Sequence, residues 1–373
     1  MTTDASTPLN TGRGGNVSAY DRWLATQDVP VHTGYYVQDA RTLERGWWSL
    51  RQCPAAVLNL AGHSGVTEAH ILEIPPGESI PAFRMAIEDV VYVMEGQGVA
   101  TVWAEGQPKV HFEWGKHSLF RIPTNYYYQL SNLRGDQPAL TMHVSYLPLA
   151  LTTNSNTKYI FDNPFVDTSE VYGDEDGFYA HEAKAVQRPD GRTEWYGNFF
   201  PDLTVWDKLS AYGGPDRQAY SGGIVFPNSS HRPGLMVLPK RRYRAAHRHG
   251  PGVTIIGIQE ATGFVVMWHP DGDETIVAPW QEGSVFVPPN MWYHQHVNSG
   301  GVENRQLRIF PPRPIMNYSF IDPKQYIPFI EEDPWVREKF EAELAANGLT
   351  SLMPAEAYVD PNYEWDAEWL TKE

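Results

Sequence analysis

The chain has 373 residues and one cysteine, Cys53, so no disulfide can form within it. A chain with no disulfide framework is typical of a reducing compartment. No segment approaches the roughly 20 apolar residues that a membrane-spanning helix needs. The polar stretch 1–16 lacks the apolar segment of a secretory signal. We therefore expect a soluble cytoplasmic protein with no membrane partner.

Positive charge is also scarce. Lys and Arg number 29 against 45 Asp and Glu, which gives a formal net charge of −16. A negative field repels phosphate backbones, so we expect no nucleic-acid partner. We interpret the excess of acidic residues as serving solubility.

Glycine and proline are plentiful, at 31 and 30 residues, and 42% of the chain is hydrophobic. The length suits two domains, and this composition favours many turns and sizeable cores. Short runs of strand composition are separated by Gly, Pro and Asn, for example 100–103, 118–122, 263–268 and 284–287. Evenly spaced short strands are typical of a sandwich or closed barrel. We therefore predict an all-β fold with a few short peripheral helices.

Two helices are expected. The clearer one begins at Pro334 behind the N-cap Asp333 and ends before Gly348. Its apolar positions repeat every four residues and would cover a barrel: Val336, Phe340 and Leu344. A short N-terminal helix is expected at 19–24.

The sequence contains an internal duplication. Residues 91–103 resemble 256–268 at a shift of 165, and 114–132 resemble 280–298 at a shift of 166. Two stretches at nearly one offset indicate two copies of one domain. Trp268 repeats Trp103 and Tyr293 repeats Tyr127, which favours packing roles for these aromatic residues. The expected division is an N-terminal extension 1–69, a first barrel 70–150, a linker 151–220, a second barrel 221–315 and a C-terminal extension with a helix 316–373.

Three histidines indicate a metal site in the second copy. His247 and His249 alternate along an expected strand, so both imidazoles share one face. His294 enters a later strand after a turn with two prolines. Neutral imidazole is the commonest metal ligand in proteins. We therefore predict that these three residues bind one divalent ion.

The duplication supplies an internal control. Applying the two shifts places Ala82, Arg84 and Tyr128 at the positions of the three histidines. Histidines kept for packing would be expected in both copies. We therefore predict that the first barrel lacks metal ligands, with its mouth filled by the aromatic residues 126–128.

The pattern resembles the cupin superfamily, in which an alternating His pair is followed by a Pro-containing turn, a third His and an Asn four residues later. Pro289, His294 and Asn298 stand on the last three of these positions. The resemblance covers roughly 70–150 and 230–315 and implies two jelly-roll barrels in tandem, a bicupin, and a homo-oligomer. Thr254 stands where the family often has a glutamate ligand, which leaves a three-histidine site.

Among bicupins the sequence is similar to the gentisate and 1-hydroxy-2-naphthoate ring-cleaving dioxygenases, although that group typically holds its metal in the N-terminal barrel. The resemblance implies an Fe(II)-dependent dioxygenase that uses O₂ to cleave a C–C bond of a hydroxylated aromatic acid or a similar chelating molecule. Mn, Ni, Zn or Cu would fit the same ligands. A non-oxidative decarboxylase, isomerase or hydrolase and a non-catalytic small-ligand-binding protein remain the alternatives.

Four further residues are candidates for the reaction. His296 shares a face with His294 and would serve as an alternative ligand or as an acid–base group. Arg244 and Arg308 are candidates to hold a substrate carboxylate, and the alternative for each is an ordinary surface or interface arginine. Gln306 shares a face with Arg308 by strand alternation and would line the barrel mouth.

Overall fold

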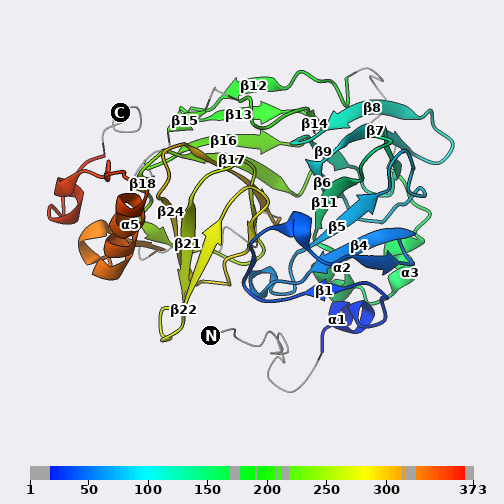
Figure 1. The fold of residues 1–373 in the computed structure, drawn as a ribbon. Coiled ribbons are helices and arrows are strands. Elements are labelled where there is room, and N and C mark those ends of the chain that lie inside the picture. The colour runs from blue at the N-terminus through cyan, green and yellow to red at the C-terminus, as the bar shows by residue number, and fades with distance from the viewer. Residues whose placement is uncertain are drawn as a thin grey trace.

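In this computed structural model the chain is described at residues 17–167, 177–189, 191–206, 209–211, 218–312, 315 and 325–365. A first barrel, coloured blue to cyan, lies beside a second barrel, coloured green to yellow (Figure 1). Each barrel is built from two sheets of mostly antiparallel strands. The predicted all-β architecture with a few short helices is confirmed.

The larger sheet of the first barrel has the order β1-β4-β5-β11-β6-β9-β14, with β3 paired to β4, and the smaller sheet has the order β10-β7-β8. The bounds are β1 Val31–His32, β3 Gly46–Trp48, β4 Cys53–Leu58, β5 Glu68–Ile74, β6 Asp89–Glu95, β7 Gln97–Trp103, β8 Val110–Gly115, β9 Leu119–Ile122, β10 Tyr127–Asn132, β11 Ala139–Ser145 and β14 Phe199–Phe200.

The second barrel repeats this plan. Its larger sheet has the order β12-β13-β16-β17-β25-β20-β23-β2, with β15 paired to β16, and its smaller sheet has the order β22-β21-β24-β19-β26, with β18 paired to β24. The bounds are β2 Tyr36–Val37, β12 Lys184–Gln187, β13 Thr193–Tyr196, β15 Ser210–Ala211, β16 Tyr220–Val225, β17 Arg232–Leu238, β18 Arg242–Tyr243, β19 Ala246–His247, β20 Thr254–Gly257, β21 Gly263–Trp268, β22 Thr275–Trp280, β23 Val285–Phe286, β24 Tyr293–Asn298, β25 Asn304–Phe310 and β26 Tyr326–Ile327.

The expected domain boundaries need correction. Strands β3 and β4 belong to the first barrel's sheet, although 1–69 was expected to be an N-terminal extension and arm. Strand β2 pairs with β23, so the N-terminal arm also reaches the second barrel. From the expected linker, β14 pairs with β9 of the first barrel and β13 pairs with β16 of the second. These segments therefore join both barrels.

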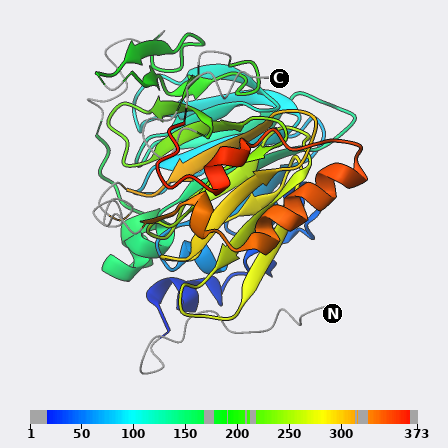
Figure 2. The ribbon, with the colours of Figure 1, turned by 90° about the vertical axis from the view of Figure 1, so that its left-hand side faces the viewer.

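The helices lie at the periphery: α1 Ala19–Leu24, α2 Leu147–Thr153, α3 Thr157–Phe161 and α5 Pro334–Ala346, with short 3₁₀ turns at Ala40–Thr42, Ala61–His63, Phe329–Glu331 and Ala355–Tyr358. Helix α5 lies across the outside of the second barrel (Figure 2). The Asp333 carboxylate accepts from the Trp335 backbone N–H, and Val336, Phe340 and Leu344 are buried. Both predicted helices are confirmed. In the described part of the chain, no helix is long and apolar enough to cross a membrane.

One apolar layer joins the barrels. Strand alternation turns Ile71, Val90 and Met142 of the first large sheet toward Leu235, Ile256 and Leu307 of the second. Burying each such side chain stabilises the fold by roughly 1.5–3 kcal/mol. The opposite faces of the same strands point into the two barrel interiors, where the polar residues discussed below are found.

The aromatic framework of the duplication is confirmed. Trp103 stacks on Tyr127 with 5.3 Å between the ring centroids, and Trp268 stacks on Tyr293 with 5.6 Å between the centroids. The guanidinium of Arg84 lies over Tyr127, and that of Arg248 lies over Tyr293. These clusters show which residues of the two copies correspond.

Asn298 has a structural role that repeats in the first copy. Its amide nitrogen donates to the carbonyls of Leu238, Pro239 and Val302. Asn132 makes the same kind of bonds to Ile74, Pro75 and Gln137. The asparagine of the motif therefore locks a turn in each barrel.

His63 lies buried where the N-terminal arm meets the second barrel. Its Nδ1 accepts from the Leu60 backbone N–H at 3.1 Å, and its Nε2 lies 3.3 Å from Thr254 Oγ1. Burial lowers the pKa of His63 to about 4. The neutral ring fits these two bonds, and an imidazolium would not.

We expect acid to destabilise the fold through this residue. Because the folded-state pKa lies below the ordinary value of about 6.5, the unfolded chain takes up the proton first as the pH falls. As the pH falls from 6.5 to 4, the free energy of unfolding should decrease by about 3 kcal/mol because of His63. Urea titrations at pH 7 and pH 4 measure this difference. His63→Gln should reduce it and the exposed His111→Gln should not; an equal acid response in both variants would contradict the assignment.

Candidate metal centre

Four imidazoles converge inside the second barrel. His247 on β19 is the cross-strand partner of His294 on β24. His296 follows two residues later on β24 and therefore shares the face of His294. His249 lies just beyond β19, and its carbonyl accepts from the Met291 backbone N–H of the Pro-containing turn. The turn and the strand pairing together bring distant parts of the sequence to one point.

The rings are close enough to share an ion. Ligand nitrogens of His247, His294 and His296 all lie within 4.8 Å of one another. The centroid of His249 lies 4.6 Å from that of His294 and 6.1 Å from that of His247. The structure thus brings together all three predicted ligands and adds His296, while His249 lies outside the tightest group.

The protonation states suit metal binding. Burial, reinforced by neighbouring imidazoles and Arg244, holds the pKa of His247, His294 and His296 well below 6.5. Burial also lowers the pKa of His249 to about 4. All four rings are therefore neutral at pH 7, and each has a nitrogen lone pair for a ligand.

Two ring nitrogens of this group have no hydrogen-bond partner. His294 Nε2 and His296 Nδ1 are fully buried and unpaired. An unpaired buried polar atom costs roughly 1–3 kcal/mol, so it calls for an explanation. His249 differs, because its Nδ1 lies 2.7 Å from the Gly250 carbonyl, which leaves Nε2 with the lone pair. A divalent ion would satisfy these nitrogens, so the residues fit a metal.

The internal comparison needs a correction of one residue. Phe83 pairs with Tyr128 as His247 pairs with His294, and Arg84 matches Arg248 rather than His249. The local shift is therefore 164, and Phe83 takes the place expected for Ala82. The Met85 carbonyl accepts from a turn N–H as the His249 carbonyl does, so Met85 is the counterpart of His249. The Leu130 carbonyl likewise accepts from a backbone N–H as the His296 carbonyl does, so Leu130 is the counterpart of His296. The expectation that these positions of the first barrel lack imidazoles is unchanged.

The position expected for a fourth ligand also needs correction. Thr254 faces the layer between the barrels, where its hydroxyl contacts His63. Ile255 pairs with Arg308 in the second barrel as Val91 pairs with His143 in the first. By this register Val253 is the counterpart of Asp89, and both positions face a barrel interior. A slip of one residue reverses the face of a strand residue. The interior position is apolar, so the carboxylate ligand is still missing.

The predicted anion-binding residues lie near the imidazoles. Arg244 is buried, its backbone N–H donates to the His296 carbonyl, and its charge lowers the pKa of all four rings. Arg308 is 7% exposed and donates to Ser221 Oγ at 3.0 Å. Gln306 is buried, and its Oε1 has no hydrogen-bond partner. Two cations and one acceptor therefore share this interior with the rings.

Two residues near the rings escaped sequence analysis. Tyr326 on β26 stacks on His247 at 5.9 Å, because the C-terminal extension adds a strand beside β19. Tyr35 of the N-terminal arm packs against Trp292 at 5.4 Å. Neither segment carries a motif, and only the strand pairing of both extensions brings these rings to the site.

The first barrel holds a buried polar cluster that the sequence comparison missed. Ligand atoms of His70, Asp89 and His143 lie within 4.8 Å of one another. His70 and His143 stack at 4.9 Å from the neighbouring strands β5 and β11. Neither strand carries the motif, so no spacing signal marks this group. The first barrel thus contains a group that could hold an ion, and the expectation that it lacks metal ligands stays a prediction.

The ring nitrogens of this cluster are already bonded. His143 contacts Asp89 at 2.7 Å and Thr141 at 3.1 Å. His70 contacts Glu68 at 3.1 Å and the Arg51 guanidinium at 3.4 Å. Each ring nitrogen has a partner, in contrast to the second barrel, whereas Asp89 Oδ1 has none. The two imidazoles therefore need no ion to satisfy them.

Arg51 supplies the positive charge here. Its guanidinium lies over the Phe83 ring at 4.0 Å and donates to the Tyr128 hydroxyl at 2.7 Å. These two residues correspond to His247 and His294, so Arg51 lies where the second barrel gathers its ligands. Burial opposes the ionisation of Asp89, but its neighbours, His143 foremost, lower its pKa to about 2. The Arg51 guanidinium makes a smaller contribution in the same direction and is linked to Asp89 through the Tyr128 hydroxyl.

The sequence matches no protein-family profile and no curated protein. Similar solved structures include oxalate decarboxylase from Bacillus subtilis, with 15% identity, a TM-score of 0.45 and coverage of 75% of this chain and 77% of that one. Salicylate 1,2-dioxygenase from Pseudaminobacter salicylatoxidans has 17% identity, a TM-score of 0.48 and coverage of 68% and 73%. Vicilin from tomato has 13% identity, a TM-score of 0.43 and coverage of 74% and 84%. At this level of likeness, none of them assigns an activity or a metal to this chain.

We expect the second barrel to bind a single divalent ion. Metal analysis should find it in the wild-type protein and should find little in the His247→Ala/His294→Ala double variant. A saturating ion at 100 times its Kd should stabilise the wild type by ~2.7 kcal/mol and should leave the double variant unchanged. His70→Gln in the first barrel is the matched control and should retain the ion. If only His70→Gln lost the ion, the metal site would lie in the first barrel and the assignment to the second would be wrong.

We expect Arg51→Met to destabilise the first barrel by ~1–3 kcal/mol, because it leaves the buried Tyr128 hydroxyl and His70 ring without their partner and removes a positive charge near Asp89. Arg84→Met is the control, since its guanidinium also lies over a tyrosine but pairs with no buried acid; its cost should stay below ~1 kcal/mol. Urea unfolding at pH 7 measures both. Equal costs would show that Arg51 acts only by stacking.

Proposed function

We propose that the chain is a metal-dependent enzyme that acts on a small anionic molecule inside the second barrel. The observation that carries this proposal is the convergence of neutral, buried imidazoles with two unpaired ring nitrogens. Among the described residues the group contains no carboxylate. An all-nitrogen set leaves the charge of a divalent ion uncompensated, which favours a chelating anion such as a hydroxy-carboxylate or catecholate.

His247, His294 and His296 would hold the ion, with His249 as a fourth imidazole within reach. The position of His296 inside the tightest group supports a ligand role over the alternative acid–base role. The Nδ1 of His249 lies within hydrogen-bond distance of the Gly250 carbonyl, and this contact orients the ring so that Nε2 is available to an ion.

Arg244 and Arg308 would bind and orient the substrate carboxylate, since both guanidinium groups are buried beside the rings. Gln306 Oε1 would accept a hydrogen bond from a substrate hydroxyl. Apolar side chains of the same interior, Val253, Ile255 and Phe286, would exclude water around the bound molecule. The chain thus supplies orientation and a dry environment.

The finer proposal is an Fe(II)-dependent dioxygenase that cleaves a C–C bond of a hydroxylated aromatic acid. Bound Fe(II) would supply a Lewis acid and an electron path between the chelated substrate and O₂. The nitrogen-only set, the paired arginines and the motif resemblance to ring-cleaving bicupins support this choice. The metal is named by this resemblance and by no contact in the structure.

Oxygen consumption tests the finer proposal. Anaerobically purified protein loaded with Fe(II) should consume O₂ with at least one of gentisate, salicylate and 1-hydroxy-2-naphthoate, and removal of O₂ should abolish turnover. Turnover that persists without O₂ would reject the dioxygenase and support a non-oxidative metal enzyme. Ligand binding without turnover, undiminished in His247→Ala, would support a non-catalytic binding protein.

The anion-binding residues have their own test. We expect Arg308→Gln to raise KM by at least roughly ten-fold, because a charge-assisted pair to the substrate is lost. Arg305→Gln is the matched control, since Arg305 lies on the same strand but donates to the Trp206 carbonyl outside the barrel interior. Steady-state kinetics of both variants separate substrate binding from general damage to β25. A similar KM in both variants would contradict the role of Arg308.

A further inference from the structure

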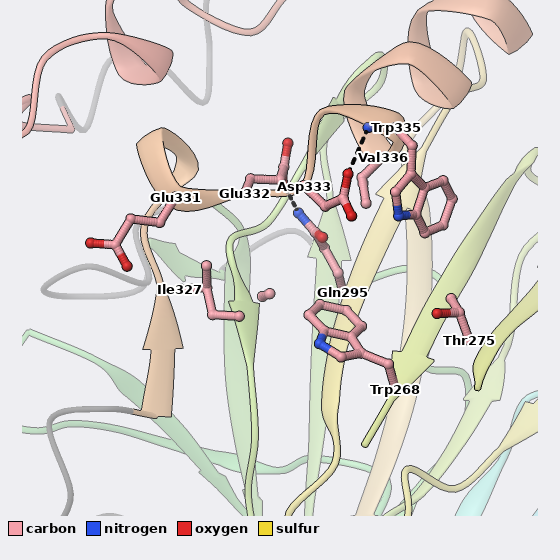
Figure 3. Close-up of a pocket in the computed structure, with 10 residues that line it drawn as sticks. Trp268, Thr275, Gln295, Ile327, Glu331, Glu332, Asp333, Trp335 and Val336 are labelled. Carbon is pink, nitrogen blue, oxygen red and sulfur yellow. Dashed lines mark hydrogen bonds between the residues drawn. The ribbon is translucent and has the colours of Figure 1, made fainter. Parts of the chain in front are cut away.

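A second cavity lies on the outer face of the second barrel, away from the imidazoles. It has a volume of about 230 Å³ and lies between the small sheet and the C-terminal segment that leads into α5 (Figure 3). Trp268 and Gln295 come from the sheet, and Glu331, Glu332, Asp333 and Trp335 come from the C-terminal segment. We call this cavity the indole–acid pocket.

The lining has one sign of charge. Three acidic residues and no basic residue line the cavity. The nearby Arg337 is engaged elsewhere, since its Nε donates to Glu341 at 2.8 Å and its guanidinium lies over the Tyr358 ring. Two indoles provide flat apolar walls with negative faces. The pocket therefore favours a cation with an organic stem.

Gln295 points independently to a ligand. Its side chain is fully buried and lines the pocket, and its Nε2 donates to Glu332 (Figure 3). Its Oε1 has no hydrogen-bond partner. A buried acceptor calls for a donor, and none of the side chains that line the pocket supplies one to Gln295 Oε1. Inorganic cations and quaternary ammonium ions carry no N–H group, whereas a primary ammonium ion carries three.

Glu332 is largely removed from water. Burial raises the pKa of Glu332 to about 7, although bonds from Tyr243 and Gln295 and the charge of Arg337 oppose this rise. Its Oε2 accepts from the Tyr243 hydroxyl at 2.7 Å. Each carboxylate oxygen has a second lone pair, so both remain able to accept from a ligand.

We propose that the indole–acid pocket binds a small primary ammonium ion with a short alkyl stem. The ammonium group donates to Gln295 Oε1 and to Glu332, and the stem packs between Trp268 and Trp335. The volume suits a ligand of a few heavy atoms and excludes a drug-sized molecule. Because side chains alternate along β24, Gln295 faces this pocket while His294 and His296 face the barrel interior.

Calorimetric titration of the full chain with n-butylammonium chloride tests the proposal, with n-butanol as the neutral probe of similar shape. We expect saturable binding of the ammonium ion that is at least roughly ten-fold tighter than binding of the alcohol, because the carboxylate interaction depends on charge. The same binding is expected in chelator-treated protein, so this test is independent of any metal chemistry in the barrel interior. Equal binding of the two probes, or no saturable binding of the ammonium ion, would overturn the proposal.

Variants locate the site. Glu332→Gln should weaken n-butylammonium binding by at least roughly ten-fold, and Trp335→Leu should weaken it by about three-fold through loss of apolar contact with the stem. Glu338→Gln is the matched control, since it removes the same charge from an exposed position of α5 outside the pocket. Undiminished binding in Glu332→Gln would refute the site. Should that variant fail to fold, the comparison of the two probes on the wild-type protein still decides.

Discussion

The constraint behind both barrels is that a polar group removed from water must find a partner. Each barrel interior holds buried polar side chains facing apolar walls, where an unmatched nitrogen or oxygen is costly. The first barrel meets this constraint for its imidazoles, because Arg51 and a chain of hydrogen bonds pair the ring nitrogens of His70 and His143, and it leaves Asp89 Oδ1 unpaired. The second barrel leaves His294 Nε2 and His296 Nδ1 unpaired. This difference at the ring nitrogens, more than the number of histidines, supports placing the proposed metal site in the second barrel.

The duplication shows how one scaffold holds these two interiors. The framework is shared: the asparagines lock equivalent turns, and the Trp–Tyr stacks occupy equivalent places. The interior positions differ as a set. Where the first barrel stacks two imidazoles from β5 and β11, strand register places Gly234 opposite Arg308 in the second. The lack of a side chain at Gly234 leaves room for the guanidinium, which lies 3.5 Å from an ideal Cβ there.

The extensions complete the second barrel. Strand β26 of the C-terminal extension places Tyr326 against His247, and the N-terminal arm packs Tyr35 against Trp292. The same C-terminal segment continues into α5 and closes the outer face of β24. A single strand, β24, thus lies between two environments of opposite character. Imidazoles and arginines face its inner side, and carboxylates and indoles face its outer side.

Much of this arrangement could be predicted from sequence, because it depends on local chemistry. Repeated turn residues indicated two β-domains, the Asp333 cap indicated α5, and alternating histidines indicated convergence in the second copy. Tertiary structure decided what depends on register and on distant contacts. The two copies are offset locally by 164 residues instead of 165, so Phe83 and not Ala82 is the counterpart of His247. The same one-residue difference places Thr254 on the face outside the barrel interior, because strand faces alternate with every residue. The His70–His143 cluster and its partner Arg51 lie outside any motif, since only strand pairing brings them together. Sequence therefore determined which groups are available, and the pairing of strands decided which of them are left without a partner.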